Sequence, residues 1–181
     1  LFLPEGENRK GEGGLRTKGY FKKSFDDKPL ISIITVVFNG EKYLEETIQS
    51  VINQTYGNLE YIIIDGGSTD GTLDIIKKYE KYITYWISEP DSGIYDAMNK
   101  GIDIATGEWI NFMNAGDSFV EKNTISKVVK KIGEDTDIIS GDIFYIESDK
   151  KTYKKSAKLE NKLKHMFCFH QSMFTKIDLM K

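Results

Sequence analysis

The sequence has few of the features that mark secreted, membrane-spanning or nucleic-acid-binding proteins. Its one cysteine, Cys168, cannot form a disulfide within the chain, and a zinc site built from several cysteines is excluded. The longest apolar run, residues 31–38, is far shorter than the ~20 residues of a membrane-spanning helix. The net charge of −3 does not indicate a nucleic-acid partner. We therefore expect a cytoplasmic protein.

Buried strands alternate with amphipathic helices, and this order predicts an α/β domain. Residues 31–38 and 59–64 are continuously apolar, as strands buried on both faces are. Residues 41–53 carry apolar side chains at helical spacing, a second helix follows residue 70, and residues 84–88 form a third strand. Such alternation is typical of a parallel sheet with right-handed crossovers. We expect one domain over residues 29–181.

Residues 1–28 are polar and rich in glycine, and they show no helical or strand period. This composition predicts a flexible N-terminal arm. The alternative is an arm that docks on the domain through Leu15, Tyr20 and Phe21. In that case its cations could meet an anionic ligand or a lipid surface: Arg16, Lys18, Lys22 and Lys23.

The most informative stretch runs from residue 88 to residue 119. Residues 94–105 predict a helix because one stripe is apolar at a period of 3.6: Ile94, Ala97, Met98, Gly101, Ile102 and Ala105. Either Asp91 or Ser92 can cap its first turn. Residues 108–113 then predict a buried strand, which places Asp117 in a turn at the carboxyl end of that strand.

The remaining third of the chain predicts smaller elements. We expect a helix over residues 122–132, a strand over residues 137–140 and a hairpin over residues 141–155 that turns near residue 149. Residues 158–164 are basic and resemble a helix, and residues 167–174 predict a last strand around His170 and Gln171.

Polar or aromatic residues follow three of the predicted parallel strands: Phe38 and Asn39, then Asp65, then Asp117. The carboxyl ends of parallel strands meet at one edge of the sheet, where ligands bind. A carboxylate at residue 65 can accept the N–H of uracil or ribose hydroxyls, and Phe38 can offer a stacking face. The alternatives are that Asp65 only shapes a turn and that Phe38 packs in the core. The glycine pattern supports neither a dinucleotide nor a P-loop motif.

Asp117, with Asn114 three residues before it, predicts half of a metal site. Mg²⁺ and Mn²⁺ bind through one or two carboxylates completed by substrate phosphates. The alternative is that Asp117 caps the helix predicted to begin near Lys122.

Three long motifs together resemble those of family 2 glycosyltransferases. They read TVVFNGEKYLEETIQSVINQTY, EYIIIDGGSTDGT and SEPDSGIYDAMNKGIDIATGEWINFMNAGD. The resemblance covers about residues 29–174 and is strongest to the bacterial branch that builds surface polysaccharides. It implies the GT-A nucleotide-diphospho-sugar transferase fold, a Rossmann-like, mostly parallel sheet flanked by helices. It also implies transfer of a sugar from a nucleotide donor, usually UDP-linked, to a saccharide or lipid-linked acceptor, with inversion at the anomeric carbon.

The resemblance also implies roles for individual residues. The implied nucleotide contacts are Val36, Phe38, Asn39, Asp65, Ser68 and Asn114. The implied contacts with the donor's sugar and diphosphate are Asp91, Asp96, Asn99 and Lys100, for which a solvated helix face is the alternative. His170 and Gln171 match an acceptor-side motif, although His170 could instead be a hydrogen-bonded core residue. Asp117 matches the metal ligand for Mg²⁺ or Mn²⁺, while Asn114 and Gly116 stand where acids are common.

Inverting transfer needs a general base within hydrogen-bond reach of the acceptor hydroxyl. In the family this base follows the segment that matches His170, and Asp178 fits it poorly. We therefore expect the base beyond Lys181, the domain to be truncated on its acceptor side, and binding of UDP-sugar with little turnover. Two alternatives are a nucleotide-sugar-binding module and a sugar-phosphate nucleotidyltransferase. A lipid-linked acceptor would bring the basic residues 150–164 to the inner face of a membrane, although a solvated surface also explains them.

Overall fold

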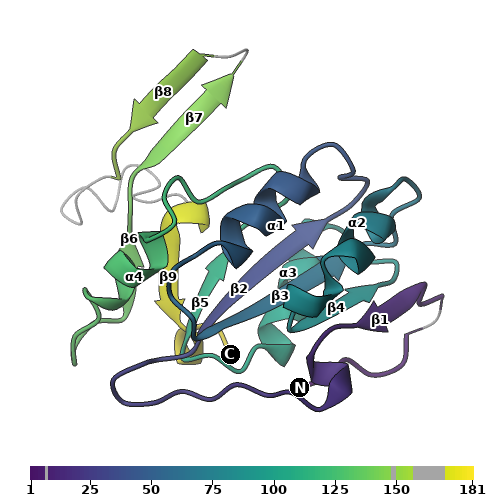
Figure 1. Ribbon diagram of the computed structural model, residues 1–181, viewed down its shortest axis with the longest axis horizontal. Helices are drawn as coiled ribbons and strands as arrows, with labels where there is room; N and C mark the ends of the chain where they lie inside the picture. Colours follow the sequence, from purple (N-terminus) through teal and green to yellow (C-terminus); the bar gives the residue numbers. More distant parts are fainter. Residues whose placement is uncertain (7, 148–149, 157–169) are drawn as a thin grey trace.

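The computed structural model describes residues 1–6, 8–147, 150–156 and 170–181, and its main feature is one mixed sheet (Figure 1). The strand order is β1-β4-β3-β2-β5-β9-β6. The four central strands β4, β3, β2 and β5 are parallel, whereas β1, β9 and β6 pair antiparallel. The bounds are β1 Gly11–Gly13, β2 Ile31–Val37, β3 Leu59–Asp65, β4 Tyr85–Ser88, β5 Trp109–Phe112, β6 Ile138–Ser140 and β9 Met173–Lys176.

Helices cover both faces of this sheet. Helices α1 (Leu44–Ile52), α2 (Thr72–Lys78) and α4 (Thr124–Val129) pack on one face. Helix α3 (Ile94–Ile104) packs on the other, where Ala97 and Ile104 join the core. A Cβ atom at Gly101 would lie 2.7 Å from Ile34 Cγ2, so α3 approaches β2 closely because it has a glycine there. All seven residues of β2 are buried, which explains its continuous apolar sequence.

The predicted strands at residues 31–38, 59–64, 84–88 and 108–113 are confirmed, as are the helices between them. The structure shortens the helix predicted over residues 122–132, because α4 ends at Val129. Helix α3 begins after Gly93, whose φ is +112°, and no side chain caps it directly. The Asp91 carboxylate accepts a hydrogen bond from the Gly93 N–H at 2.9 Å, so it holds the residue that precedes the first turn of α3.

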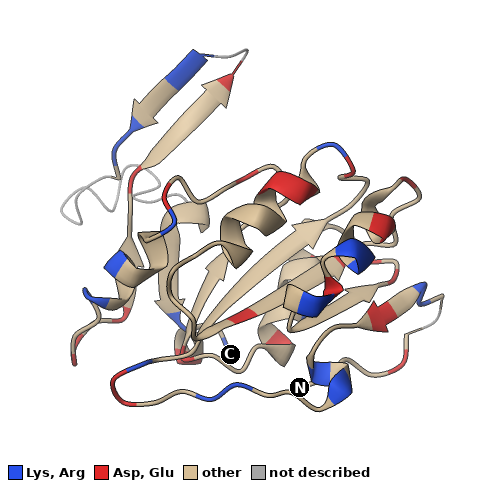
Figure 2. Cartoon of the chain, viewed as in Figure 1, with Lys and Arg blue, Asp and Glu red and all other residues tan. Residues whose placement is uncertain are grey.

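The predicted hairpin is confirmed as β7 (Ile143–Glu147) and β8 (Lys150–Lys154), which extend away from the main sheet (Figure 1). Lysines are prominent on β8 (Figure 2), and Tyr145 and Tyr153 are exposed. The predicted last strand begins only at Met173, after the 3-10 helix η4 (His170–Ser172). The helix predicted over residues 158–164 lies outside the described residues. No helix of the described residues is long and apolar enough to cross a membrane.

The N-terminal segment departs from the flexible arm expected from its composition. It adds β1 to the edge of the sheet, antiparallel to β4, and continues into the 3-10 helix η1 (Arg16–Lys18). The alternative of an arm that docks on the domain agrees with the structure through Leu15, which is partly buried and donates its N–H to the Ile83 carbonyl at 3.0 Å, whereas Tyr20 and Phe21 are exposed. Arg16 is buried instead, and its guanidinium lies 2.6 Å from the Glu60 carboxylate.

The glycines that made the segment appear unstructured are the reason it can pack. The Trp86 ring lies against β1, and Cβ atoms at Gly11 and Gly13 would lie 2.9 Å and 2.7 Å from atoms of that ring. A strand with side chains at these positions would be pushed off the sheet. The short remaining 3-10 helices are η2 (Glu80–Tyr82) and η5 (Ile177–Leu179).

Candidate functional site

The site lies at the edge where the four parallel strands end. Strand pairing places Val37 beside Asp65, and Asp65 beside Ser88. The segments that leave this edge are residues 38–40, 65–68, 89–91 and 114–117. The sequence prediction that three strand ends converge is therefore confirmed by the sheet order.

Asp65 is fully buried, and neighbouring groups occupy both of its carboxylate oxygens. It accepts hydrogen bonds from the Ser68 N–H at 3.1 Å, from the Ser68 hydroxyl and from the Ser88 hydroxyl at 2.5 Å. Gly67, at φ +80°, lets the chain reverse within this loop. In this conformation Asp65 shapes the loop at residues 65–68 and is not exposed to a ligand.

Phe38 and Asn39 follow β2 and have contrasting surroundings. The Phe38 side chain is 65% exposed, so the alternative that it packs in the core is wrong. Asn39 has φ +50°, its N–H donates to the Ser68 hydroxyl at 2.7 Å, and its Oδ1 accepts from the Thr69 N–H at 2.9 Å. Val36 is buried in the core under α3. The exposed ring therefore projects from a backbone that is held in place.

The residues expected to meet the donor's sugar and diphosphate lie in the segment before α3 and in the first two turns of that helix. An Asp91 carboxylate oxygen lies 2.6 Å from where a Cβ of Gly66 would be, so Asp91 faces the loop at residues 65–68. The Lys100 ammonium lies 3.0 Å from Glu89 and 3.7 Å from Asp96. The Asn99 side chain is exposed. Lys100 is thus held beside the site by carboxylates.

The turn at residues 114–117 meets the segment that holds His170 and Gln171. The Asn114 amide N–H donates to His170 Nε2 at 3.1 Å, and Gln171 hydrogen-bonds the Asp117 side chain. Burial raises the pKa of the Asp117 carboxyl, and Gln171 and His170 oppose that rise. Within the described part of the chain, Asn114 Oδ1 is buried without a hydrogen-bond partner. This turn therefore has a buried amide oxygen that the described residues leave without a hydrogen-bond donor.

Three further residues of the site were not among those predicted from the sequence. Thr47 on α1 donates to the Asp117 carbonyl at 2.8 Å and accepts from the Gly116 N–H at 3.0 Å, which fixes the turn. Ser88 bonds Asp65, and Glu89 bonds Lys100. A polar residue on an apolar helix face, such as Thr47, is a signal that could have been noticed.

Residues 32–179 match the family described as Glycosyl transferase family 2. The chain belongs to this family. A PGL/p-HBAD biosynthesis glycosyltransferase of Mycobacterium bovis is 40% identical over 122 residues, which are 64% of this chain and 47% of that protein. The putative teichuronic acid biosynthesis glycosyltransferase TuaG of Bacillus subtilis is 38% identical over 105 residues, 55% of this chain and 40% of TuaG. The chain thus spans less than half the length of these curated relatives.

Solved structures support the fold of this family 2 chain. TarS 1-349 of S. aureus in complex with UDP-GlcNAc has a TM-score of 0.69 at 21% identity, over 83% of this chain and 46% of that one. The mannosyltransferase PcManGT of Pyrobaculum calidifontis, in complex with GDP-Man and Mn²⁺, has a TM-score of 0.57 at 23% identity, over 70% and 41%. The expected GT-A fold is confirmed.

The donor atoms of this family 2 site fit a divalent ion only in part. Asp117 offers a carboxylate, and Asn114 offers a buried amide oxygen that has no hydrogen-bond partner among the described residues. Both are hard ligands of the kind that Mg²⁺ and Mn²⁺ prefer. The described residues hold no group of three or more His, Cys, Asp or Glu side chains that could bind a metal alone. The set is adequate if a diphosphate supplies the remaining oxygens.

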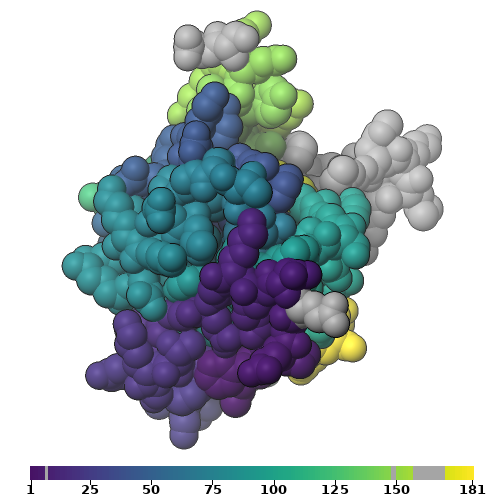
Figure 3. Space-filling model, turned by 90° about the vertical axis from the view of Figure 1, so that its right-hand side faces the viewer, coloured from purple at the N-terminus to yellow at the C-terminus, as the bar shows by residue number. Residues whose placement is uncertain are grey.

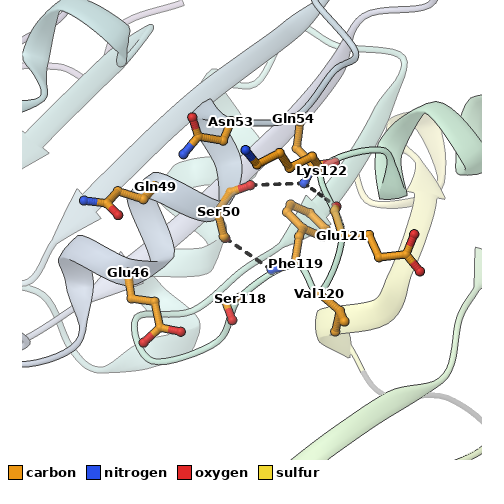
Figure 4. Close-up of a pocket in the computed structure, with 10 residues that line it drawn as sticks. All are labelled: Glu46, Gln49, Ser50, Asn53, Gln54, Ser118, Phe119, Val120, Glu121 and Lys122. Atoms are coloured by element: carbon orange, nitrogen blue, oxygen red, sulfur yellow. Dashed lines mark hydrogen bonds between the residues drawn. The ribbon is translucent and has the colours of Figure 1, made fainter.

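A separate pocket of about 250 Å³ lies between α1 and residues 118–122, which follow the turn at residues 114–117 (Figure 4). The Ser50 hydroxyl accepts the Phe119 N–H at 3.2 Å across it, and Gln54 donates to the Glu121 carbonyl at 2.9 Å. None of the predicted site residues lines it. Its walls are Glu46, Gln49, Ser50, Asn53, Gln54, Ser118, Phe119, Val120, Glu121 and Lys122.

Proposed function

We propose that this chain is the donor-binding part of an inverting glycosyltransferase. It would transfer a sugar from a nucleotide donor, UDP-linked, to a saccharide or lipid-linked acceptor of a cell-surface glycan. The observation that carries the proposal is the convergence of Phe38, the loop at residues 65–68 and the turn at residues 114–117 at one sheet edge. The names of its relatives, in PGL/p-HBAD and teichuronic acid biosynthesis, support the glycan class.

The nucleotide would lie against the exposed Phe38 ring and the backbone of residues 65–68. Aromatic faces stack on planar bases. Asp65 and Ser68 then contribute by holding the loop, whereas Asn39 and Asn114 lie nearer the ligand. UDP-GlcNAc in TarS and GDP-Man in PcManGT support a nucleotide-sugar donor. UDP is the nucleotide that we propose, and GDP is the alternative from which the experiment must distinguish it.

In the proposed reaction the acceptor hydroxyl oxygen attacks the anomeric carbon as the bond to the β-phosphate oxygen breaks. The hydroxyl proton passes to a general base, and the nucleotide diphosphate leaves. Asp117 and Asn114 would hold a divalent ion, which supplies positive charge for the departing diphosphate. His170 and Gln171, through their contacts with these two residues, would set the boundary between donor and acceptor.

The donor sugar would lie toward Asp91, which precedes α3, and toward Asp96 and Asn99 in the first two turns of that helix. Asp91 connects this region with the loop at residues 65–68, which we call the nucleotide loop, since its carboxylate faces Gly66. Lys100 is paired with Glu89 at 3.0 Å, so a contact with the diphosphate would require it to turn away from that carboxylate.

Isothermal calorimetry tests this proposal. We expect UDP to bind at least tenfold more tightly than GDP, and Mn²⁺ to strengthen UDP binding. Asp117→Asn should remove the effect of the metal on UDP binding. Asp103→Asn, which changes an exposed carboxylate on α3, should leave that effect in place. Binding of neither nucleotide to the wild type would contradict the proposal.

A further inference from the structure

The N-terminal segment runs along the edge of the sheet, antiparallel to β4, and makes contacts near both ends of β3. Near the amino end of β3, Arg16 and Glu60 form an ion pair with side chains 1% and 3% exposed. Near the carboxyl end, the Lys10 N–H donates to the Ser88 carbonyl at 2.7 Å, and β1 pairs with β4 from Gly11 onward. The space-filling view shows this purple segment lying directly against the teal body of the domain (Figure 3).

Lys10 reaches from this segment to the nucleotide loop. Its ammonium donates to the Gly67 carbonyl at 2.7 Å and to the Ser68 carbonyl at 3.0 Å. The loop's N–H groups are held from the other side, since Ser68 donates to Asp65 and Thr69 donates to Asn39. The donors of the loop are therefore fixed by the domain, whereas two of its carbonyls are fixed by the N-terminal segment.

Arg9 makes a second connection, to the segment that precedes α3. Its guanidinium lies 2.9 Å from Glu89, and the same carboxylate lies 3.0 Å from Lys100. The Glu89 N–H donates to the Asp65 carbonyl at 3.0 Å, so this residue adjoins the nucleotide loop as well. Burial alone would raise the pKa of Glu89, but hydrogen bonds from Lys100 and Arg9 hold it below its ordinary value.

We propose that residues 9–16 belong to the donor site, in which Lys10 and Arg9 are positioning residues for nucleotide binding. The inference rests on the proposed function, because it assigns these residues to the same donor site. Lys10 holds the loop at residues 65–68 in the conformation that receives the nucleotide. Arg9 holds Glu89, which pairs with the ammonium of Lys100 on α3. A preorganised loop binds more tightly because ordering it costs nothing at the moment of binding.

The chain offers a matched control for Lys10. The exposed Lys22 also donates to two backbone carbonyls, Gly57 at 3.2 Å and Leu59 at 2.7 Å, but at the amino end of β3. Lys10→Ala and Lys22→Ala therefore remove the same kind of contact at opposite ends of one strand. Both variants lose one lysine ammonium that donates to two carbonyls. A difference between them in UDP affinity would therefore arise from where that contact lies in the structure.

The experiment measures UDP affinity by calorimetry and amide hydrogen exchange of residues 66–69 without ligand. We expect Lys10→Ala to weaken UDP binding about five- to tenfold and to speed exchange in the loop, with Lys10→Arg within about twofold of wild type. Lys22→Ala should leave both unchanged, and the two alanine variants should have similar melting temperatures.

Equal UDP affinity in Lys10→Ala and wild type would overturn the inference while leaving the proposed function in place. Equal losses in Lys10→Ala and Lys22→Ala would also overturn it, because the effect would then be general destabilisation. A wild type that binds no nucleotide would overturn the proposed function and this inference together.

Discussion

Two loops at the same sheet edge use their polar groups in opposite ways. In the loop at residues 65–68, the Asp65 carboxylate is fully buried and bonded to Ser68 and Ser88. In the turn at residues 114–117, Asn114 Oδ1 has no partner among the described residues and burial raises the pKa of Asp117. The first loop is satisfied internally and provides shape. The second retains capacity that a ligand or a cation can satisfy.

The largest expected effect breaks the satisfied loop. Asp65→Ala leaves the buried Ser88 hydroxyl and the Ser68 N–H without their acceptor, and we expect a loss of about 3 kcal/mol in the free energy of unfolding, with no UDP binding. Urea denaturation measures the loss. The exposed change Asp103→Ala should stay within about 0.5 kcal/mol of wild type. Equal stabilities of the two variants would show that the loop does not depend on Asp65.

The second effect concerns the carboxylate that ties this loop to the N-terminal segment. Glu89→Gln should cost about 2 kcal/mol at neutral pH, because Arg9 and Lys100 lose a largely buried charged partner. The pKa of Glu89 is lowered from its ordinary 4.5 in the folded state, so the wild-type advantage is complete above that value and is lost as the pH falls through the lowered pKa. Denaturation curves at several pH values check this. A difference that does not change with pH would contradict it.

The third effect sharpens the contrast in the open turn. Because burial raises the pKa of Asp117, the folded state holds the proton more tightly than the unfolded chain, and this group's contribution to stability falls as the pH rises through that pKa. Asp117→Asn should therefore be at least as stable as wild type at pH 7. With Mn²⁺ present, its UDP affinity should be at least about tenfold weaker than that of the wild type, because the gain that the metal brings is lost. A large loss of stability in Asp117→Asn would contradict this prediction, because it would show that Asp117 supports the conformation of its loop as Asp65 does.

The smallest effect concerns the exposed ring beside the satisfied loop. Phe38→Ala should change stability by no more than about 0.5 kcal/mol, since the side chain is 65% exposed. It should weaken UDP binding by about three- to tenfold, the value of one aromatic contact. Tyr95→Ala, at a residue that is 79% exposed on α3, is the matched control and should bind UDP as the wild type does.

The central sheet and its helices could be predicted because their apolar periods are strong. Residues 31–38 and 59–64 could only be buried strands, and their order made the site edge a consequence of topology. The turn at residues 114–117 was found for the same reason, since it directly follows a strand. Its contact with His170 could not come from spacing, because it depends on where β9 returns to the sheet.

The N-terminal segment shows where composition misleads. Its glycines indicated a flexible chain, yet they are what allows β1 to lie against Trp86. The partner that explains them is more than 70 residues away, and no local pattern records it. The same applies to Asp65, whose burial by Ser88 depends on the pairing of β3 with β4.

The measurement that tests the contrast most directly is the anomalous diffraction of Mn²⁺ in crystals of the chain grown with UDP and MnCl₂. The account predicts an anomalous peak beside Asp117 and Asn114, with the Asp65 carboxylate still bonded to Ser68 and Ser88. A peak at Asp65, or Asp65 turned outward to the base while the turn at residues 114–117 holds no metal, would contradict it.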